Sequence, residues 1–136
     1  MFIDTSYLLA LELKKDQNHS VAQQHWQKLM LAPPHLITTS YIFDELVTFL
    51  NSRSYHTKAI TIGKTLLTSS FIEFIQVDET LFLEGWAYFQ QHDDRTYSLT
   101  DCVSFVVMQK FDIYTALTFD KHFAQAGFLT EPIYSL

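Results

Sequence analysis

Residues 71–77 read FIEFIQV, and a short polar step later residues 81–92 read LFLEGWAYFQQH. The first run is rich in β-branched and aromatic residues, which is typical of a strand, and the second has the length of a helix. The same alternation of strand and helix continues on both sides of this stretch. Strands that alternate with helices are joined by crossover connections, so the sequence predicts an α/β domain with a mostly parallel sheet covered on both faces.

The other predicted elements, which lie on both sides of residues 71–92 in the sequence, are short. Pro33 and Pro34 end a helix before the second strand, because proline cannot continue a helix. Residues 4–6 are expected to form a polar turn, and Gly127 is expected to cap the last helix. We predict strands at 2–3, 36–38 and 113–117, and helices at 7–14, 19–31, 40–51, 57–69, 101–110 and 121–126. In open parallel sheets ligands bind at the carboxyl ends of the strands, so the residues that follow each strand are the place to look for a site.

Composition narrows the class of protein. The chain has 136 residues, which predicts a single domain over residues 1–136, and 48% of its residues are hydrophobic, enough for a real core. Nine basic residues stand against fifteen acidic ones, for a net charge of −6. This balance argues against a protein that coats nucleic acid through a broad basic surface. It remains compatible with an enzyme that meets phosphate through bound cations.

The remaining composition argues against several other sites and compartments. Cys102 is the single cysteine, which suits a reducing compartment, and we interpret it as a core thiol rather than a nucleophile. The first residues lack a signal-peptide pattern, and no apolar run approaches the roughly 20 residues needed to span a bilayer. We therefore expect a cytoplasmic protein. The six histidines show no zinc spacing, the three glycines form no phosphate loop, and residues 93–95 (DDR) are interpreted as a solvated loop.

Four carboxylates fall where a site is expected, although each has a simpler explanation. Asp4 and Asp120 follow predicted strands, and either residue alone is explained as a helix cap. Asp101 follows Ser98 at capping-box spacing. Glu45 borders the apolar stripe of its helix, where an ion pair would explain it equally well. Its neighbour Asp44 belongs to the polar face and is interpreted as solvated.

Taken together, the four carboxylates favour a metal site. If the strand ends converge, Asp4, Glu45, Asp101 and Asp120 share one hollow without an obvious basic partner. Two unit charges about 4 Å apart repel by about 4 kcal/mol at an effective dielectric constant near 20. Such a group must hold protons or bind a divalent cation, and carboxylate oxygens are the ligands that Mg²⁺ and Mn²⁺ prefer.

Four motifs, in order and over essentially the whole chain, resemble those of PIN domains, above all the small prokaryotic type that includes VapC-like toxins. They are residues 2–6 (FIDTS), 39–46 (TSYIFDEL), 98–101 (SLTD) and 117–123 (LTFDKHF). The resemblance implies a three-layer α/β/α fold and Mg²⁺- or Mn²⁺-dependent hydrolysis of RNA. It assigns the family's acidic site, both catalytic and metal-binding, to Asp4, Glu45, Asp101 and Asp120.

The resemblance also assigns supporting residues and partners. Thr118 and Ser6 match positions that support the acidic site, whereas Phe119 replaces an arginine common in relatives and His122 replaces an acid found in some. A small antitoxin protein and a second copy of the chain are the partners that it implies. The alternative is a catalytically silent PIN-like interaction domain whose acids serve only as caps. Stabilisation by Mg²⁺ or Mn²⁺ distinguishes the two hypotheses, because scattered caps do not bind the ion.

Overall fold

The computed structural model describes residues 1–133, and its centre is a five-stranded sheet. The strands are β1 (Phe2–Ile3), β2 (Leu36–Thr39), β3 (Ile72–Ile75), β4 (Thr115–Leu117) and β5 (Leu129–Glu131), in the spatial order β3-β2-β1-β4-β5. All four pairings are parallel. The predicted α/β class with a mostly parallel sheet is confirmed.

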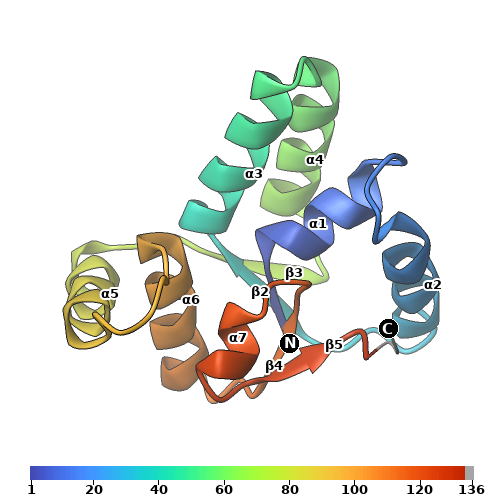
Figure 1. Cartoon of the computed structure of the whole chain (residues 1–136). Helices are drawn as coiled ribbons and strands as arrows, with labels where there is room; N and C mark the ends of the chain where they lie inside the picture. Colours follow the sequence, from blue (N-terminus) through green and yellow to red (C-terminus); the bar gives the residue numbers. More distant parts are fainter. Residues whose placement is uncertain (134–136) are drawn as a thin grey trace.

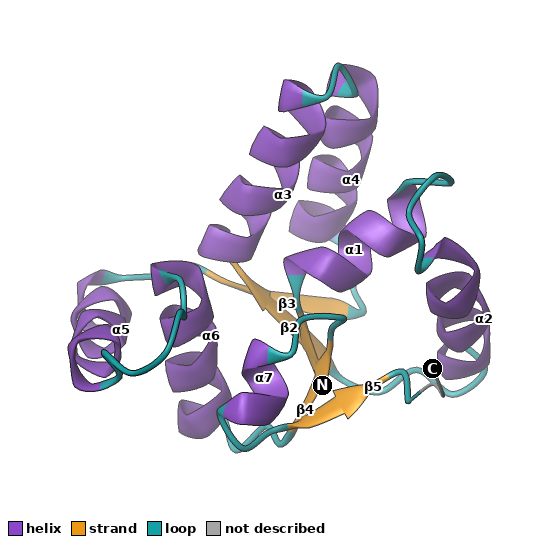
Figure 2. Cartoon of the chain, viewed as in Figure 1, coloured by secondary structure: helices purple, strands orange, loops and turns teal. Residues whose placement is uncertain are grey.

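Helices cover both faces of the sheet and complete three layers (Figures 1 and 2). They are α1 (Thr5–Glu12), α2 (His19–Leu29), α3 (Ser40–Ser52), α4 (His56–Thr68), α5 (Glu79–Gln91), α6 (Leu99–Lys110) and α7 (His122–Gln125). From β1 to β3 the chain steps toward one edge of the sheet, and it then crosses back to β4 and β5. Because such crossovers are right-handed, α1–α4 lie on one face and α5–α7 on the other. None of the helices in residues 1–133 combines the length and apolarity that crossing a bilayer requires.

The core lies around the middle strand β1 and the helix α6. Phe2 and Ile3 of β1 have no exposed surface, which explains why a strand of only two residues is wholly apolar. On α6 every residue from Asp101 to Met108 is buried, as expected for a helix that is apolar nearly all round. These two buried elements carry Asp4 and Asp101 at their ends, so the core holds the backbone of both acids in place.

The structure corrects several predicted boundaries. Residues 4–6 do not form a turn, because α1 already begins at Thr5 and Asp4 stands directly between strand and helix. The strand β5 is an addition, since its residues Leu129–Glu131 contain no apolar run that predicts a strand. The strand expected at 71–77 is limited to Ile72–Ile75, where it pairs with β2.

Gly85 allows α5 and α6 to pack closely, which yields a stability prediction. A Cβ atom at Gly85 would lie 2.5 Å from Val103 Cγ2 and 3.3 Å from Val103 Cα, and Val103 is fully buried. We expect Gly85→Ala to lower the free energy of unfolding by about 1–3 kcal/mol in urea denaturation.

Gly63→Ala on α4 is the matched control. Its Cβ would meet the ring edge of Phe43 at 3.3 Å and Val47 Cγ1 at an ordinary 3.7 Å, and both of these side chains are partly exposed. Relief of the helix penalty of glycine, about 1 kcal/mol, should offset this contact. Equal destabilisation by the two substitutions would contradict the packing argument.

Candidate active site

The four predicted acids line a single hollow at the carboxyl ends of β1 and β4. We call it the acid hollow, and it is lined by Asp4, Thr5, Ser6, Leu9, Glu45, Phe49, Thr96, Ser98, Asp101, Asp120 and His122. Asp4 directly follows β1, Asp120 follows β4, Glu45 lies on α3, and Asp101 lies in the first turn of α6. Figure 1 shows the N-terminal ends of α1, α3 and α6 gathered around this edge of the sheet. The topology thus brings together residues that are far apart in the sequence.

Asp4 is the most constrained of the four acids. Its backbone N–H donates to the carbonyl oxygen of Leu117 at 3.0 Å, which ties it to the end of β4. Its Oδ2 accepts hydrogen bonds from the Ser6 hydroxyl at 2.8 Å and from the Thr118 hydroxyl at 2.7 Å. Within residues 1–133, Asp4 Oδ1 has no hydrogen bond, and the Asp4 side chain does not cap the N-terminus of α1. The carboxylate is therefore held on one side and available to a ligand on the other.

Ser6 and Thr118, which the resemblance predicts to support the acidic site, both donate to Asp4 Oδ2. Their hydroxyl oxygens are 3.1 Å apart, and each also accepts a backbone N–H, Ser6 from Phe119 and Thr118 from Asp120. These bonds connect the first turn of α1 to the segment after β4. The two hydroxyls fix both the Asp4 carboxylate and the backbone that carries Asp120.

Burial raises the pKa of Asp4 from 3.8 to about 6. The hydrogen bonds from Thr118 and Ser6 oppose this shift, whereas the negative charges of Asp101 and Asp120 add to it. Desolvation outweighs the hydrogen bonds because the carboxyl group is removed from water almost completely. The folded protein therefore stabilises the charged form of Asp4 poorly unless a cation accompanies it.

Glu45 reaches the acid hollow from α3, and its pKa is also raised. Desolvation is the main cause, the Thr5 hydroxyl opposes it, and the charges of Asp101 and Asp120 add to it. Glu45 makes no ion pair within residues 1–133, so the ion-pair explanation is wrong. Asp44 is exposed and accepts a hydrogen bond from Thr48 at 3.2 Å, which agrees with the solvated position predicted for it.

Asp101 is both a helix cap and a member of the acid hollow. The capping box is complete: Asp101 N–H donates to Ser98 Oγ and Ser98 N–H donates to Asp101 Oδ2, both at 3.0 Å. The same Oδ2 lies 2.9 Å from His122 Nδ1. Burial raises the pKa of Asp101, and the bonds from Ser98 and His122 oppose the shift. The cap uses one carboxylate oxygen, so it does not prevent a role in the site.

Asp120 is a partly exposed acid of the hollow. Its Oδ1 accepts the backbone N–H of His122 at 2.9 Å, so it too caps the turn that follows. Its side chain is 34% exposed, which leaves the carboxylate in contact with solvent as well as with the hollow.

His122 is a member of the cluster that the sequence analysis named only as a departure from the family pattern and did not count among the site residues. Its Nδ1 lies 2.9 Å from Asp101 Oδ2 and 3.4 Å from Asp120 Oδ1, so the expectation of acids without a basic partner is wrong. Its Nε2 is 3.2 Å from the Thr96 hydroxyl. The signal for this residue lay in the PIN resemblance, which places an acid of some relatives at this position.

The donor atoms in the hollow fit a divalent cation. One ligand atom each from Asp101, Asp120 and His122 lies within 4.8 Å of the others. The Asp4 carboxylate lines the same hollow. Thr5 Oγ1 is buried and meets no hydrogen-bond criterion within residues 1–133, although it lies near enough to Glu45 to lower the pKa of that carboxyl. Such oxygen-rich surroundings with raised carboxyl pKa values match the chemistry of Mg²⁺ and Mn²⁺ sites.

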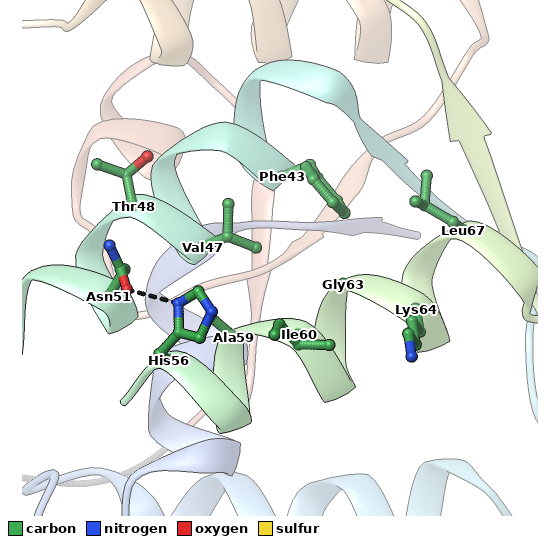
Figure 3. Close-up of a pocket in the computed structure, with 10 residues that line it drawn as sticks. All are labelled: Phe43, Val47, Thr48, Asn51, His56, Ala59, Ile60, Gly63, Lys64 and Leu67. Atoms are coloured by element: carbon green, nitrogen blue, oxygen red, sulfur yellow. Dashed lines mark hydrogen bonds between the residues drawn. The ribbon is translucent and has the colours of Figure 1, made fainter. Parts of the chain in front are cut away.

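A second hollow, between α3 and α4, has a different chemistry. Figure 3 shows Phe43 and Val47 of α3 facing Ile60 and Leu67 of α4, and the hollow contains no carboxylate. One polar contact closes its end, where His56 Nδ1 lies 2.8 Å from Asn51 Oδ1. Cys102 lies in neither hollow, and burial raises the pKa of its thiol to about 11, which agrees with its interpretation as a core residue. Unlike the acid hollow, the hollow between α3 and α4 therefore offers no carboxylate to a divalent cation.

Comparison with known proteins identifies the class. The PIN domain family model matches residues 1–129, and the chain belongs to the PIN domain family. The curated relatives include the 23S rRNA-specific endonuclease VapC20 of Mycobacterium tuberculosis, in the strains CDC 1551 / Oshkosh and ATCC 25618 / H37Rv. Each is 34% identical over 129 residues, which is 95% of this chain and 95% of the relative.

Solved structures agree with this membership. The crystal structure of Mycobacterium tuberculosis VapC20, described as a sarcin-ricin loop cleaving toxin, matches with a TM-score of 0.86 and 33% identity over 94% of this chain and 95% of that one. The structure of FitAcB from Neisseria gonorrhoeae matches with a TM-score of 0.62 and 14% identity over 95% and 94% of the two chains. The second likeness concerns the fold alone.

Proposed function

We propose that this protein is a divalent-metal-dependent endoribonuclease that hydrolyses a structured RNA, and that it is the toxin of a toxin–antitoxin pair. One observation carries the proposal: Asp4, Glu45, Asp101 and Asp120 line a single hollow. The relative named as a 23S rRNA-specific endonuclease, 34% identical over 95% of the chain, directs the proposal toward ribosomal RNA. A cytoplasmic location goes with this substrate.

In the proposed reaction the chain holds the ion and orients the phosphodiester. Asp4, Asp101 and Asp120 would hold the cation, with Glu45 completing the site directly or through water. When bound, such an ion offsets charge on the phosphoryl oxygens and makes a water molecule more acidic. Ser6 and Thr118 keep Asp4 Oδ2 engaged, so that Oδ1 would be the oxygen left for the ion. The reaction needs no side-chain nucleophile.

The alternative of a silent interaction domain fits the acid hollow less well. Burying Asp4 with a raised pKa destabilises the folded protein at neutral pH, because the charged form is poorly solvated. An interaction domain without metal chemistry would gain stability from a neutral side chain at this position. The presence of four acids around one hollow supports an enzyme.

A cleavage assay with a matched pair of variants tests the proposal. The substrate is an RNA hairpin with the sarcin-ricin loop sequence, incubated with Mg²⁺, with Mn²⁺ or with chelator. We expect cleavage only with an ion, and a loss of about 10- to 100-fold for Glu45→Gln, whose carboxylate completes the site. Asp44→Asn changes the adjacent acid, which lies outside the acid hollow, and should leave the rate unchanged. Cleavage that persists in chelator would remove the metal-dependent enzyme from consideration.

The proposed partners are a small antitoxin protein and a second copy of the chain. The apolar hollow between α3 and α4, which includes Phe43, offers surface for an apolar segment of the antitoxin. Ile60 and Leu67 on its rim are exposed in the isolated chain. Co-purification with the product of an adjacent short reading frame, and the mass of the isolated protein in solution, are the measurements that test the two partners.

A further inference from the structure

The surface of α5 carries an aromatic pair that the acid hollow does not use. Trp86 and Phe89 are one helical turn apart, and their rings stack with centroids 5.5 Å apart and an angle of 14° between the planes. They are 44% and 40% exposed. Their packing against each other holds both rings in one orientation, whereas scattered exposed apolar side chains carry no such order.

These rings border a hollow that shares one lining residue with the acid hollow. We call it the aromatic hollow, and it is lined by Trp86, Phe89, Gln90, His92, Asp93, Arg95, Thr96 and Tyr97. Thr96 lines both hollows. The Thr96 hydroxyl lies 3.2 Å from His122 Nε2, and His122 Nδ1 lies 2.9 Å from Asp101 Oδ2. Thr96 and His122 therefore link the aromatic hollow to Asp101 of the acid hollow through two consecutive contacts.

The inner wall of the aromatic hollow is rigid. Tyr97 is buried, and its ring packs edge-to-face on Phe105 of the core at 5.1 Å and on His122 at 5.3 Å. His92 stacks on Tyr88 with centroids 4.0 Å apart, and its Nδ1 donates a hydrogen bond to the Tyr88 carbonyl oxygen at 2.8 Å. The side chains of a rigid wall lose little conformational entropy when a ligand binds. Such a wall favours a planar ligand that stacks on the rings.

The charges at the aromatic hollow favour a base over a phosphate. Among the residues that line the aromatic hollow, Arg95 is the only arginine, and there is no lysine. The Arg95 Nε atom lies 4.0 Å from Asp94 Oδ2. Asp93 lines the same hollow. Two acids beside one arginine repel a phosphate backbone, whereas the neutral face of a nucleobase is not repelled. Every base has such a face, and aromatic side chains bind unpaired bases by stacking on it.

We propose that Trp86 and Phe89 form a stacking platform for an unpaired base of the RNA substrate, adjacent to the phosphodiester held in the acid hollow. The proposal rests on the proposed function and adds a contact that selects RNA with an unstacked base beside the cleavage point. Gln90, Arg95 and Thr96 line the same hollow and offer hydrogen-bonding groups to the edge of that base.

Kinetics of three variants test the platform. We expect Trp86→Ala to raise KM for the loop-containing RNA hairpin by about 10-fold or more while kcat stays within about 2-fold, because a stacked base contributes mainly to binding. Trp86→Phe retains an aromatic face and should recover most of the loss. Phe111→Ala is the control: Phe111 is also 44% exposed but lies at the C-terminal end of α6, away from both hollows. An unchanged KM in Trp86→Ala would overturn the platform.

A binding measurement separates this proposal from the proposed function. The Asp4→Asn protein, which we expect not to cleave, is titrated with the labelled hairpin in a fluorescence anisotropy assay. Weaker RNA binding after Trp86→Ala is added, together with unchanged RNA binding after Phe111→Ala is added, supports the platform. This holds even where the wild-type protein shows no cleavage. Equal binding with and without Trp86→Ala overturns it. A Trp86→Ala protein whose mass in solution falls from dimer to monomer would also overturn it, by assigning the surface to an interface between copies.

Discussion

Asp4→Asn should abolish RNA cleavage, with a loss of at least about 10³-fold, while the protein stays folded. Asp4 is buried at the end of the central strand, and Ser6 and Thr118 hold one of its oxygens. Asparagine preserves the size of the side chain but removes the charge that a divalent ion requires. The measurement is the single-turnover cleavage rate at saturating Mg²⁺ or Mn²⁺. Asp44→Asn is the control, since it removes an equal charge from an exposed position.

The same substitution should not cost stability in metal-free buffer at neutral pH. Because the pKa of Asp4 is raised from 3.8 to about 6, its contribution to the free energy of unfolding is fully present below the unfolded pKa and is lost as the pH rises through about 6. A shift of this size corresponds to about 3 kcal/mol at most. We expect Asp4→Asn to equal or exceed the wild-type melting temperature above about pH 6. An unfolded Asp4→Asn protein would make its loss of activity uninformative, and Glu45→Gln at the more exposed acid then carries the test.

The second large effect is stabilisation by the ion, which we expect to grow with pH. Protons compete with the cation for Asp4, whose pKa is about 6, and burial raises the pKa values of Glu45 and Asp101 as well. At an ion concentration of about 100 times Kd, the gain should be about 2.7 kcal/mol, or roughly 10 °C in melting temperature. Below about pH 5 the gain should nearly vanish, because Asp4 is then protonated.

Thermal melts over a pH series, with and without Mn²⁺, measure this linkage. Asp4→Asn should lose the ion-dependent shift, and Asp44→Asn should keep it. A shift of equal size at every pH, or one that survives in Asp4→Asn, would place the ion elsewhere on the protein.

The elements that position the site were largely predictable, because each has a local signal. The apolar pair Phe2-Ile3 followed by Asp4 indicated a buried strand with a carboxylate at its end, and Ser98 with Asp101 indicated the capping box that begins α6. Strand-like segments that alternate with helix-like segments predicted the parallel sheet. That topology, together with the PIN resemblance, predicted the four acids at one edge of the sheet, and they line one hollow there.

The features that were missed depend on contacts between distant parts of the chain. The strand β5 is assigned by its pairing with β4, and its own residues Leu-Thr-Glu show no strand pattern. His122 has no metal-ligand spacing to any other histidine, and only the folded chain places it against Asp101, 21 residues away. Capping and site roles were treated as alternatives for Asp101, yet one carboxylate serves both because it has two oxygens.

The most direct measurement of the central claim is anomalous diffraction from a crystal of the wild-type protein soaked in Mn²⁺ at about neutral pH, where Asp4 is ionised. We expect an anomalous peak in the acid hollow within coordination distance of Asp4, Asp101 and Asp120, and no such peak in crystals of Asp4→Asn. Wild-type crystals whose anomalous peaks all lie outside the acid hollow would contradict the account.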